Sequence, residues 1–332
     1  MNLPRIAVTM GDPSGVGPEV ALRALARPEV RRSLVPVLFG DPAVFEETSR
    51  RLGLGVAFRL SEDGHPFSGR AMALRPCSEL PASARRPGRP TAAGGEASYR
   101  AILAAVEEVL AGRFDALVTG PVSKRWICEA GHRFSGHTEL LAELSGASDV
   151  RMMLVGSTLR VVLVTTHVAF RDVPGAIDSG KVERTVALAH GALRTLFGLR
   201  RPRLALCGLN PHAGEGGLWG DEEARLLDPA VRRLRRRRVG VEGPLPADAA
   251  FALHRKYDAI VCLYHDQGLA PFKLVHFEDG VNLTLGLPFV RTSPDHGTAF
   301  DLAGRGTASS RSMEEAVLLA ARLSRRRRAR RR

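Results

Sequence analysis

Three histidines that each follow a short apolar run could together bind a divalent metal. The run RVVLVTTH ends in His167, RLALCGLNPH has His212 just past its strand, and AIVCLYHDQG contains His265. Neutral imidazole is a good ligand for zinc and cobalt, and an open position on such a metal would polarise a substrate hydroxyl or carbonyl. The three residues lie far apart in the chain. Spacing alone therefore leaves open the alternative that each is a hydrogen-bonded loop residue.

Two cations and an amide that follow His265 indicate a site for an anionic ligand. Lys273, Asn282 and Arg291 come after His265 at intervals of 8, 9 and 9 residues. Arg grips a phosphate or carboxylate with two parallel hydrogen bonds, whereas Lys acts as a point charge. If both cations face one cleft, they would bind a phosphate or carboxylate there. Either cation alone would be interpreted as a solvated surface residue.

Two glycine-containing segments are typical of turns that open a helix. In MGDPSGVGPEV, Pro18 suits the first helical turn, and the backbone amides of the turn could face an anion or a cofactor. The segment is neither a P-loop, which needs Gly-Lys-Ser/Thr, nor a dinucleotide fingerprint, because it lacks the third glycine. In GHTELL, His137 and Thr138 begin a helix, where Thr is an ordinary N-cap.

The elements that must position these residues alternate between strands and helices. Nearly continuous apolar runs predict strands at 5–9, 34–38, 116–119, 160–165, 203–206, 259–263 and 282–285. Apolar residues at i, i+3 and i+4 predict helices over 99–110, 181–196, 222–234 and 313–323. Continuous apolar runs are typical of strands covered on both faces, so the sequence predicts an α/β fold with largely parallel sheets. Open sheets of this kind bind ligands beyond the carboxyl ends of their strands.

Length and composition favour a soluble cytoplasmic protein of about two domains. The chain has 332 residues, enough for about two domains of ordinary size. No run reaches the roughly 18 apolar residues of a membrane span, and the first residues lack the apolar core of a signal peptide. The four cysteines are widely separated, which favours a reducing compartment over a disulfide framework. The Pro- and Gly-rich segment Gly64–Gly95 is expected to be a long surface excursion.

The net charge of +13 is concentrated in two arginine blocks. Seven arginines lie among Arg325–Arg332, and Arg235–Arg238 add four more. Dense runs of like charge are usually disordered and solvated, so we expect residues 324–332 to form a disordered tail. The remote alternative is a non-catalytic protein that holds nucleic acid with these arginines. It predicts tight, salt-sensitive binding that disappears when residues 324–332 are deleted, together with a lack of enzyme activity.

Eight motifs in order make the sequence closely resemble the 4-hydroxythreonine-4-phosphate dehydrogenase family. They are MGDPSGVGPEV, TGPVSK, GHTELLA, TTHVAFRDVP, GLNPHAGEGG, GPLPADAAF, YHDQGLAPFK and GVNLTLGLPFVRTSPDHGTAFDLAG, and they span about Arg5 to Leu323. The resemblance implies the isopropylmalate dehydrogenase-like fold, with two α/β/α domains and an active-site cleft between them. We expect residues 1–125 plus 295–323 to form a cofactor-side domain. Residues 126–294 are expected to form a second domain with metal and substrate ligands and the dimer contacts.

The resemblance also implies roles for particular residues. The metal ligands would be His167, His212 and His265. The substrate contacts would be His137, Thr138, Lys273, Asn282 and Arg291. The loop HGTAFDLAG resembles the adenine-side loop of the wider fold group, which gives the cofactor candidates Gly297, Thr298, Ala299 and Asp301. The family is dimeric, with each active site at the subunit interface and the metal shared between chains, and Asp248 resembles a residue offered by the partner subunit.

The implied reaction is an oxidation at C3 of 4-phosphooxy-L-threonine. Hydride passes to NAD or NADP, and the resulting β-keto acid loses carbon dioxide to give 3-amino-2-oxopropyl phosphate for pyridoxal 5′-phosphate synthesis. One divalent metal per subunit (Zn, Mg or Co) would lower the pKa of the C3 hydroxyl. Lys124, Asp266 and a metal-bound water are the candidates for accepting its proton. Sister enzymes with the same motifs act on 4-phospho-threonate or 4-phospho-erythronate, and the motifs discriminate poorly between these substrates.

Overall fold

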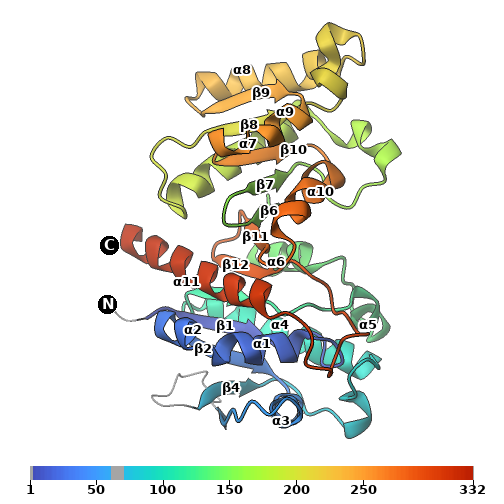
Figure 1. Cartoon of the computed structure of the whole chain (residues 1–332), viewed down its shortest axis with the longest axis vertical. Coiled ribbons are helices and arrows are strands. Elements are labelled where there is room, and N and C mark those ends of the chain that lie inside the picture. The colour runs from blue at the N-terminus through green and yellow to red at the C-terminus, as the bar shows by residue number, and fades with distance from the viewer. Residues whose placement is uncertain (1–2, 61–70, 332) are drawn as a thin grey trace. The chain divides into compact units, whose positions relative to one another are not determined.

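The chain folds into two compact α/β units. The structure, a computed structural model, describes residues 3–60 and 71–331. One unit comprises Met1–Ala147 and Leu287–Arg328, and the other comprises Ser148–Gly286 and Ala329–Arg332. Each unit has a β-sheet with helices packed on both faces (Figure 1). The predicted division at 125/126 and 294/295 differs from these limits, because residues 126–147 and 287–294 cluster with the first unit.

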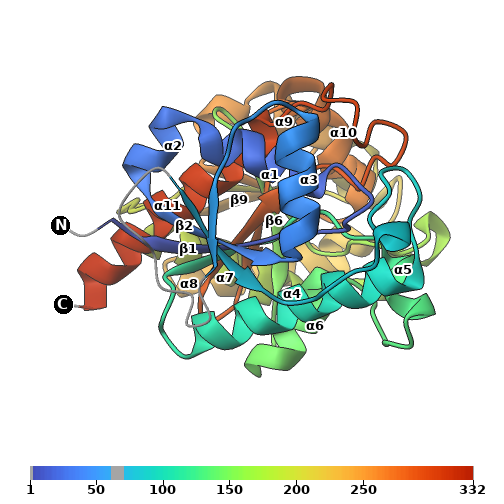
Figure 2. The ribbon, with the colours of Figure 1, turned by 90° about the horizontal axis from the view of Figure 1, so that it is seen from below.

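The first unit is built on six parallel strands in the order β3-β4-β2-β1-β5-β12. Helices α1 and α11 cover one face of this sheet and α4 the other (Figure 2). The strands are β1 (Arg5–Thr9), β2 (Val35–Gly40), β3 (Phe58–Leu60), β4 (Met72–Pro76), β5 (Ala116–Val118) and β12 (Val290–Pro294). The helices are α1 (Gly17–Ala26), α2 (Pro28–Ser33), α3 (Pro42–Arg51), η1 (Ala82–Ala84), α4 (Ala92–Leu110), α5 (Lys124–Glu129), α6 (His137–Ser145) and α11 (Arg311–Arg331).

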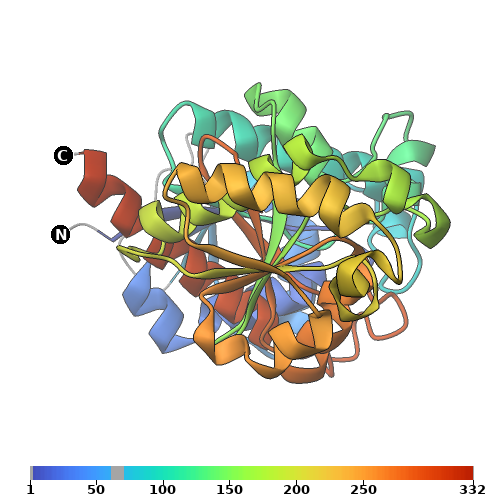
Figure 3. The same ribbon diagram turned by 90° about the horizontal axis from the view of Figure 1, so that it is seen from above.

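The second unit has a mixed sheet in the order β11-β6-β7-β10-β8-β9. Strand β6 runs antiparallel to β11 and β7, and the remaining neighbours are parallel. Helices α7 and α8 lie on one face, and α9 and α10 on the other (Figure 3). The strands are β6 (Arg151–Val155), β7 (Arg160–Leu163), β8 (Leu204–Cys207), β9 (Val241–Leu245), β10 (Ala259–Cys262) and β11 (Val281–Leu285). The helices are η2 (Phe170–Asp172), η3 (Pro174–Ala176), α7 (Ser179–Thr195), η4 (Pro211–Gly217), η5 (Glu223–Leu227), α8 (Asp228–Arg236), α9 (Ala247–Ala252), η6 (His254–Lys256) and α10 (His265–His276).

Local sequence explains where the elements begin and why the strands are buried. All residues of β8 and β10 are buried, as expected for strands covered on both faces. Pro18 lies in the first turn of α1, as predicted. Asp178 accepts a hydrogen bond from the Lys181 amide at 2.7 Å and so caps α7. The prediction of an α/β fold with largely parallel sheets is confirmed.

Two expectations from the sequence differ from the structure. The excursion expected over Gly64–Gly95 contains β4, which pairs with β2 and β3 and is mostly buried, while residues 64–70 of it lie outside the described residues. The expected disordered tail is helical, because α11 continues to Arg331 and Arg328 pairs with Asp115. Over the described part of the chain, no helix is both long and apolar enough to cross a membrane.

Candidate functional site

The glycine-rich turn after β1 packs against the predicted cofactor loop of the first unit. The Val16 amide donates to the Thr298 carbonyl at 2.9 Å. Gly15 is required at this contact, since a Cβ there would lie 2.8 Å from the Thr298 oxygen. Of the other cofactor candidates, Gly297 and Asp301 are exposed and Ala299 has a φ of 40°. Two segments far apart in sequence therefore form one surface at the carboxyl end of β1.

Asp12, in the same turn, is a buried acid that the sequence analysis did not single out. Its side chain is 1% exposed, and its Oδ1 accepts the Ser14 amide at 3.0 Å. Burial raises its pKa to about 6, against the lowering effect of that hydrogen bond. Oδ2 is buried and has no hydrogen-bond partner among the described residues. The signal that could have found it is a carboxylate placed directly after a buried strand in a turn rich in Gly and Pro.

Two predicted substrate contacts, His137 and Arg291, lie near the predicted proton acceptor Lys124 in the first unit. His137 begins α6, Lys124 begins α5, and Arg291 lies in β12 beside β5. The charges of Arg291 and Lys124 both act on His137. A Cβ on Gly136 would lie 3.5 Å from Lys124 Nζ and 2.7 Å from an oxygen of Glu139. Both side chains therefore lie close to the Gly136 backbone. Thr138 follows His137 in the first turn of α6 and is half-buried.

Electrostatics make this cluster suited to an anion. Burial lowers the pKa of His137 well below its usual value, and Arg291 and Lys124 lower it further, so the imidazole is neutral near pH 7. His137 Nε2 is buried with no hydrogen-bond partner in the part of the chain that the structure describes. Burial lowers the pKa of Arg291 to about 10, and Glu139 opposes this shift. A buried cation and an unsatisfied imidazole nitrogen match the negative charge and lone pairs of a phosphate or carboxylate.

In the second unit, two of the three predicted metal ligands lie side by side. The rings of His167 and His265 are 5.9 Å apart, centre to centre. Both line a cavity of about 300 Å³ together with Phe170 and Tyr264, whose rings meet edge-on at 5.5 Å. Asp266 Oδ1 lies 2.6 Å from His265 Nδ1. A carboxylate on one ring nitrogen is the usual support for a histidine whose other nitrogen binds a metal.

His212 lies on a strained loop that follows β8. Its φ is 52°, and the next four residues also have positive φ, which makes a left-handed turn that L residues rarely adopt. Buried Glu223 holds this loop, accepting the Leu209 amide at 2.7 Å and the Asn210 amide at 2.8 Å. Such strain persists only where surrounding contacts enforce it, and it clusters at functional sites. Glu223 was not predicted from the sequence, because its role depends on a contact across 14 residues.

Within the described residues of the second unit, the three predicted metal ligands do not form one group. Across residues 3–60 and 71–331, no group of three or more His, Cys, Asp or Glu side chains is placed to hold a metal ion. Lys273 lies two helical turns along α10 from His265, about 12 Å by the rise of a helix. Asn282 is in β11, with Oδ1 buried and unbonded among the described residues, and Asp248 is exposed on α9.

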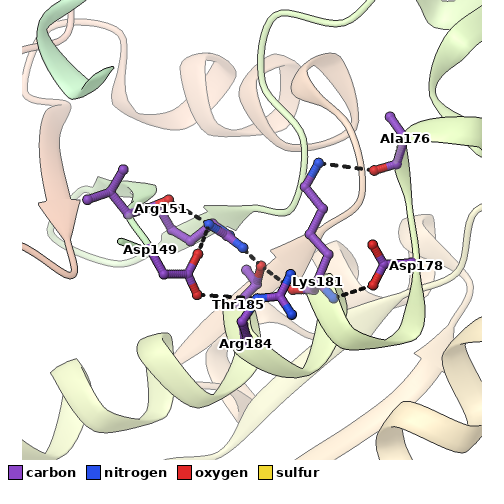
Figure 4. A network of polar contacts seen from close by, with 8 residues as sticks. Asp149, Arg151, Ala176, Asp178, Lys181, Arg184 and Thr185 are labelled. Carbon is purple, nitrogen blue, oxygen red and sulfur yellow. Dashed lines mark hydrogen bonds and ion pairs between the residues drawn. The ribbon is translucent and has the colours of Figure 1, made fainter. Parts of the chain in front are cut away.

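A polar network anchors the histidine-bearing segment between β7 and α7 (Figure 4). Lys181 Nζ donates to the Ala176 carbonyl at 3.0 Å, and Arg151 Nε donates to Thr185 Oγ1 at 2.7 Å. Burial lowers the pKa of Lys181, and the nearby charge of Arg151 lowers it further. The first bond fixes the end of the segment to the first turn of α7, and the second joins α7 to β6.

Comparison with known proteins gives consistent matches over the whole chain. The family described as "Pyridoxal phosphate biosynthetic protein PdxA" matches residues 32–320. A 4-hydroxythreonine-4-phosphate dehydrogenase of Geobacter metallireducens is 48% identical over 97% of this chain and 96% of its own length. A D-threonate 4-phosphate dehydrogenase of Cupriavidus necator is 43% identical over 98% of each chain.

Solved structures show the same similarity in three dimensions. The crystal structure of a 4-hydroxythreonine-4-phosphate dehydrogenase from Klebsiella pneumoniae matches with a TM-score of 0.84 and 39% identity, covering 97% of this chain and 98% of that one. A beta-decarboxylating dehydrogenase from Thermococcus kodakarensis matches with a TM-score of 0.50 and 15% identity, over 96% of this chain and 82% of that one. The second match concerns the fold alone, and it agrees with the predicted fold group.

Proposed function

The chain belongs to the PdxA family of pyridoxal phosphate biosynthetic proteins, and on this basis we propose that it oxidises 4-phosphooxy-L-threonine with NAD or NADP. The product, 2-amino-3-oxo-4-phosphooxybutanoate, loses carbon dioxide to give 3-amino-2-oxopropyl phosphate. The observation that carries the proposal is the anion-binding cluster made by buried Arg291, the buried ring nitrogen of His137 and the nearby exposed Lys124, which suits a small substrate with a phosphate and a carboxylate. The reaction belongs to pyridoxal 5′-phosphate synthesis in the cytoplasm.

The proposed substrate contacts are Arg291, His137, Thr138, Lys273 and Asn282. Arg291 and His137 bind an oxyanion of the substrate, Arg291 by charge and His137 through its buried ring nitrogen. Thr138 offers a hydroxyl from the same helix turn. In the second unit, Lys273 supplies a further positive charge and Asn282 an amide. Binding the substrate by groups remote from C3 fixes the reacting carbon in position, which lowers the entropic part of the barrier.

The proposed metal ligands are His167, His212 and His265. The close pair of imidazoles and the carboxylate on His265 Nδ1 fit a divalent cation, and an all-imidazole set favours Zn or Co over Mg, which prefers oxygen ligands. A bound cation would lower the pKa of the C3 hydroxyl and stabilise negative charge on oxygen. The set of three imidazoles would be completed across the subunit interface.

The proposed cofactor surface is the loop with Gly297, Thr298, Ala299 and Asp301. Its support is the contact of Thr298 with the glycine-rich turn at Gly15, which fixes the loop beside the carboxyl end of β1, where open sheets bind ligands. The nicotinamide would accept the hydride from C3. Glycine at position 297 has open space around it, so the backbone there is accessible to a ligand.

Two side chains are proposed to accept the proton of the C3 hydroxyl. Lys124 is exposed at the start of α5, next to the anion-binding cluster. Asp266 is exposed in the first turn of α10 and hydrogen-bonded to His265, so it is close to the proposed metal ligands. A water bound beside them is the third candidate.

The proposed assembly is a homodimer with each active site at the subunit interface. Its support is a set of large apolar side chains exposed on and after α10, which carries Lys273. They are Leu274, Val275 and Phe277. Clustered exposed apolar residues mark interaction sites. Asp248 would be contributed by the partner to the active site.

The second candidate function is oxidation of a 4-phosphorylated sugar acid without an amino group. It is favoured by the similarity to the D-threonate 4-phosphate dehydrogenase of Cupriavidus necator, which spans nearly the full chain. The two substrates differ in the group at C2, whereas the proposed ligands of this chain bind the phosphate, the carboxylate and the C3 oxygen. The contacts that we assign are therefore common to both reactions.

The deciding experiment compares substrates at equal metal and NAD concentrations. The purified protein is loaded with Zn²⁺ or Co²⁺ and assayed for NADH and carbon dioxide with 4-phosphooxy-L-threonine, 4-phospho-D-threonate and 4-phospho-D-erythronate. We expect the highest kcat/KM with 4-phosphooxy-L-threonine and one carbon dioxide per NADH. A higher kcat/KM with a substrate that lacks the amino group would assign the second function, and no turnover with any of them would reject both.

A further inference from the structure

The guanidinium of Arg291 is held by a buried threonine at the end of β5. Arg291 is paired with Leu117 in the register of β12 and β5, and its side chain is 2% exposed. Its NH2 group donates to Thr119 Oγ1 at 2.5 Å. Thr119 is fully buried, and its amide donates to the Thr292 carbonyl at 3.1 Å, so its own backbone is fixed by the sheet. The hydroxyl is therefore a rigid acceptor for one edge of the guanidinium.

The orientation of this guanidinium matters because of how arginine binds oxyanions. A planar guanidinium binds a phosphate or carboxylate with two parallel N–H bonds, and this requires the anion to lie in the guanidinium plane, at its edge. Glu139 acts on Arg291 through charge, and Lys124 and His137 are the other titratable groups that face the cluster. The Thr119 hydroxyl carries no charge, and its effect is to orient the Arg291 guanidinium.

We propose that Thr119 is a positioning residue for substrate binding, whose hydroxyl oxygen sets the plane of the Arg291 guanidinium so that it meets an oxyanion of the substrate edge-on. The proposal rests on the function proposed above only in taking Arg291 as the oxyanion ligand. Thr119 itself, with no exposed surface, acts through Arg291 and not by touching substrate.

The test removes the hydroxyl and keeps the shape of the side chain. In Thr119→Val we expect the KM for 4-phosphooxy-L-threonine to rise roughly 10- to 100-fold, the usual effect of losing a hydrogen bond to a charged group, with kcat changed much less. The Kd for inorganic phosphate, measured by calorimetry, should rise in parallel. Thr119→Ser keeps the hydroxyl and should restore both values to near the wild type.

Thr292→Val is the matched control. Thr292 is the neighbour of Arg291 in β12, fully buried, and its hydroxyl donates to the Ala316 carbonyl at 2.8 Å. Its loss removes a buried hydroxyl bond of the same kind but leaves Arg291 untouched, so stability should fall while KM and phosphate affinity stay unchanged. If Thr119→Val does not fold, Thr119→Cys provides a second variant without a strong acceptor.

Coupling between the two residues separates positioning from packing. In an Arg291→Lys background, which has no guanidinium plane, Thr119→Val should have no further effect on KM or phosphate affinity. Additive effects in the double variant would overturn the proposal, as would wild-type phosphate affinity in Thr119→Val or failure of Thr119→Ser to restore it.

The phosphate titration distinguishes failure of this proposal from failure of the proposed function. If the wild type binds phosphate through Arg291 but shows no turnover, the proposed reaction fails, and the Thr119 variants still decide the positioning role. If the wild type turns over and Thr119→Val behaves like it, only the positioning role fails. If the wild type binds no phosphate, the positioning role is rejected.

Discussion

At the residue scale, the buried carboxyl group of Asp12 makes the stability of the first unit depend on pH. Its pKa is about 6 in the fold against 3.8 when unfolded, so the fold favours the protonated acid. The stabilisation of the fold by the protonated acid is fully present below pH 3.8 and is lost as the pH rises through 6. Asp12→Asn is neutral at every pH. We expect its unfolding free energy, relative to wild type, to increase by about 2 kcal/mol between pH 4.5 and pH 7.5.

Urea denaturation of both proteins across this range measures the effect. Parallel pH profiles for Asp12→Asn and wild type would contradict the assignment of a raised pKa to this carboxyl. A suitable control is Asp172→Asn, since Asp172 is exposed on η2 and makes only a loose pair with Arg171. That variant should follow the wild-type profile.

Glu139 should influence activity at alkaline pH through Arg291. Its charge raises the pKa of Arg291, which burial has lowered to about 10. In Glu139→Gln this support is lost, so the pKa of Arg291 falls and the arginine loses its proton at lower pH. We expect the alkaline rise in KM for 4-phosphooxy-L-threonine to move to lower pH, with little change at pH 7. A KM profile from pH 7 to 10.5 measures this, and superimposable profiles would argue against a Glu139–Arg291 interaction.

The positions of the main candidate residues could be predicted from the sequence, but the burial of other important side chains could not. His167 and His265 were identified because each follows a predicted strand, and Arg291 because it is one of the cations that follow His265 in a family motif. Asp12 and Thr119 are ordinary turn and strand-end residues in the sequence, and only the fold reveals that they are almost fully buried. Their properties arise from desolvation, which a linear pattern does not encode.

At the scale of elements, the contact between the glycine-rich turn and the 295–304 loop should tolerate no extra atom. In Gly15→Ala the new Cβ would lie 2.8 Å from the Thr298 carbonyl oxygen and 3.1 Å from its Cβ. Relieving this steric clash requires moving one of the two segments. We therefore expect destabilisation of about 1–3 kcal/mol and weaker NAD binding. Gly191→Ala in α7 is the control, since its Cβ would meet nothing within 4 Å. Equal stability of Gly15→Ala and wild type would show that the two segments are not in contact.

Among the described residues, five strands were not predicted from the sequence: β3, β4, β6, β9 and β12. The seven predicted strands are present within a few residues of their predicted limits. The missed β9 and β12 contain proline and polar residues, yet β12 is entirely buried, because neighbours on both faces cover it. In α11 the apolar periodicity ends at Leu323, whereas the helix continues, since arginine has high helix propensity and Asp115 anchors Arg328.

At the scale of the whole molecule, the exposed apolar surface of α10 should be the dimer contact. Phe277 is 76% exposed and Leu274 is 88% exposed, which is costly in water unless a partner covers them. We expect Phe277→Glu to weaken dimerisation more than tenfold and to reduce turnover with it. Sedimentation velocity measures the first effect and NADH production the second. Leu110→Glu, at an exposed position of α4 in the other unit, is the control. An undissociated, active Phe277→Glu dimer would place the interface elsewhere.

The central claim is that His167, His212 and His265 bind one divalent cation per chain, and a Co²⁺ titration tests it directly. Visible absorption of the metal-free protein is followed as Co²⁺ is added, for wild type and for each single His→Ala variant. We predict saturation at one Co²⁺ per chain in wild type and a loss of tight binding in all three variants, because a catalytic site with three protein ligands loses a third of its donors in each variant. Tight binding at one equivalent in any of the three variants would contradict the claim.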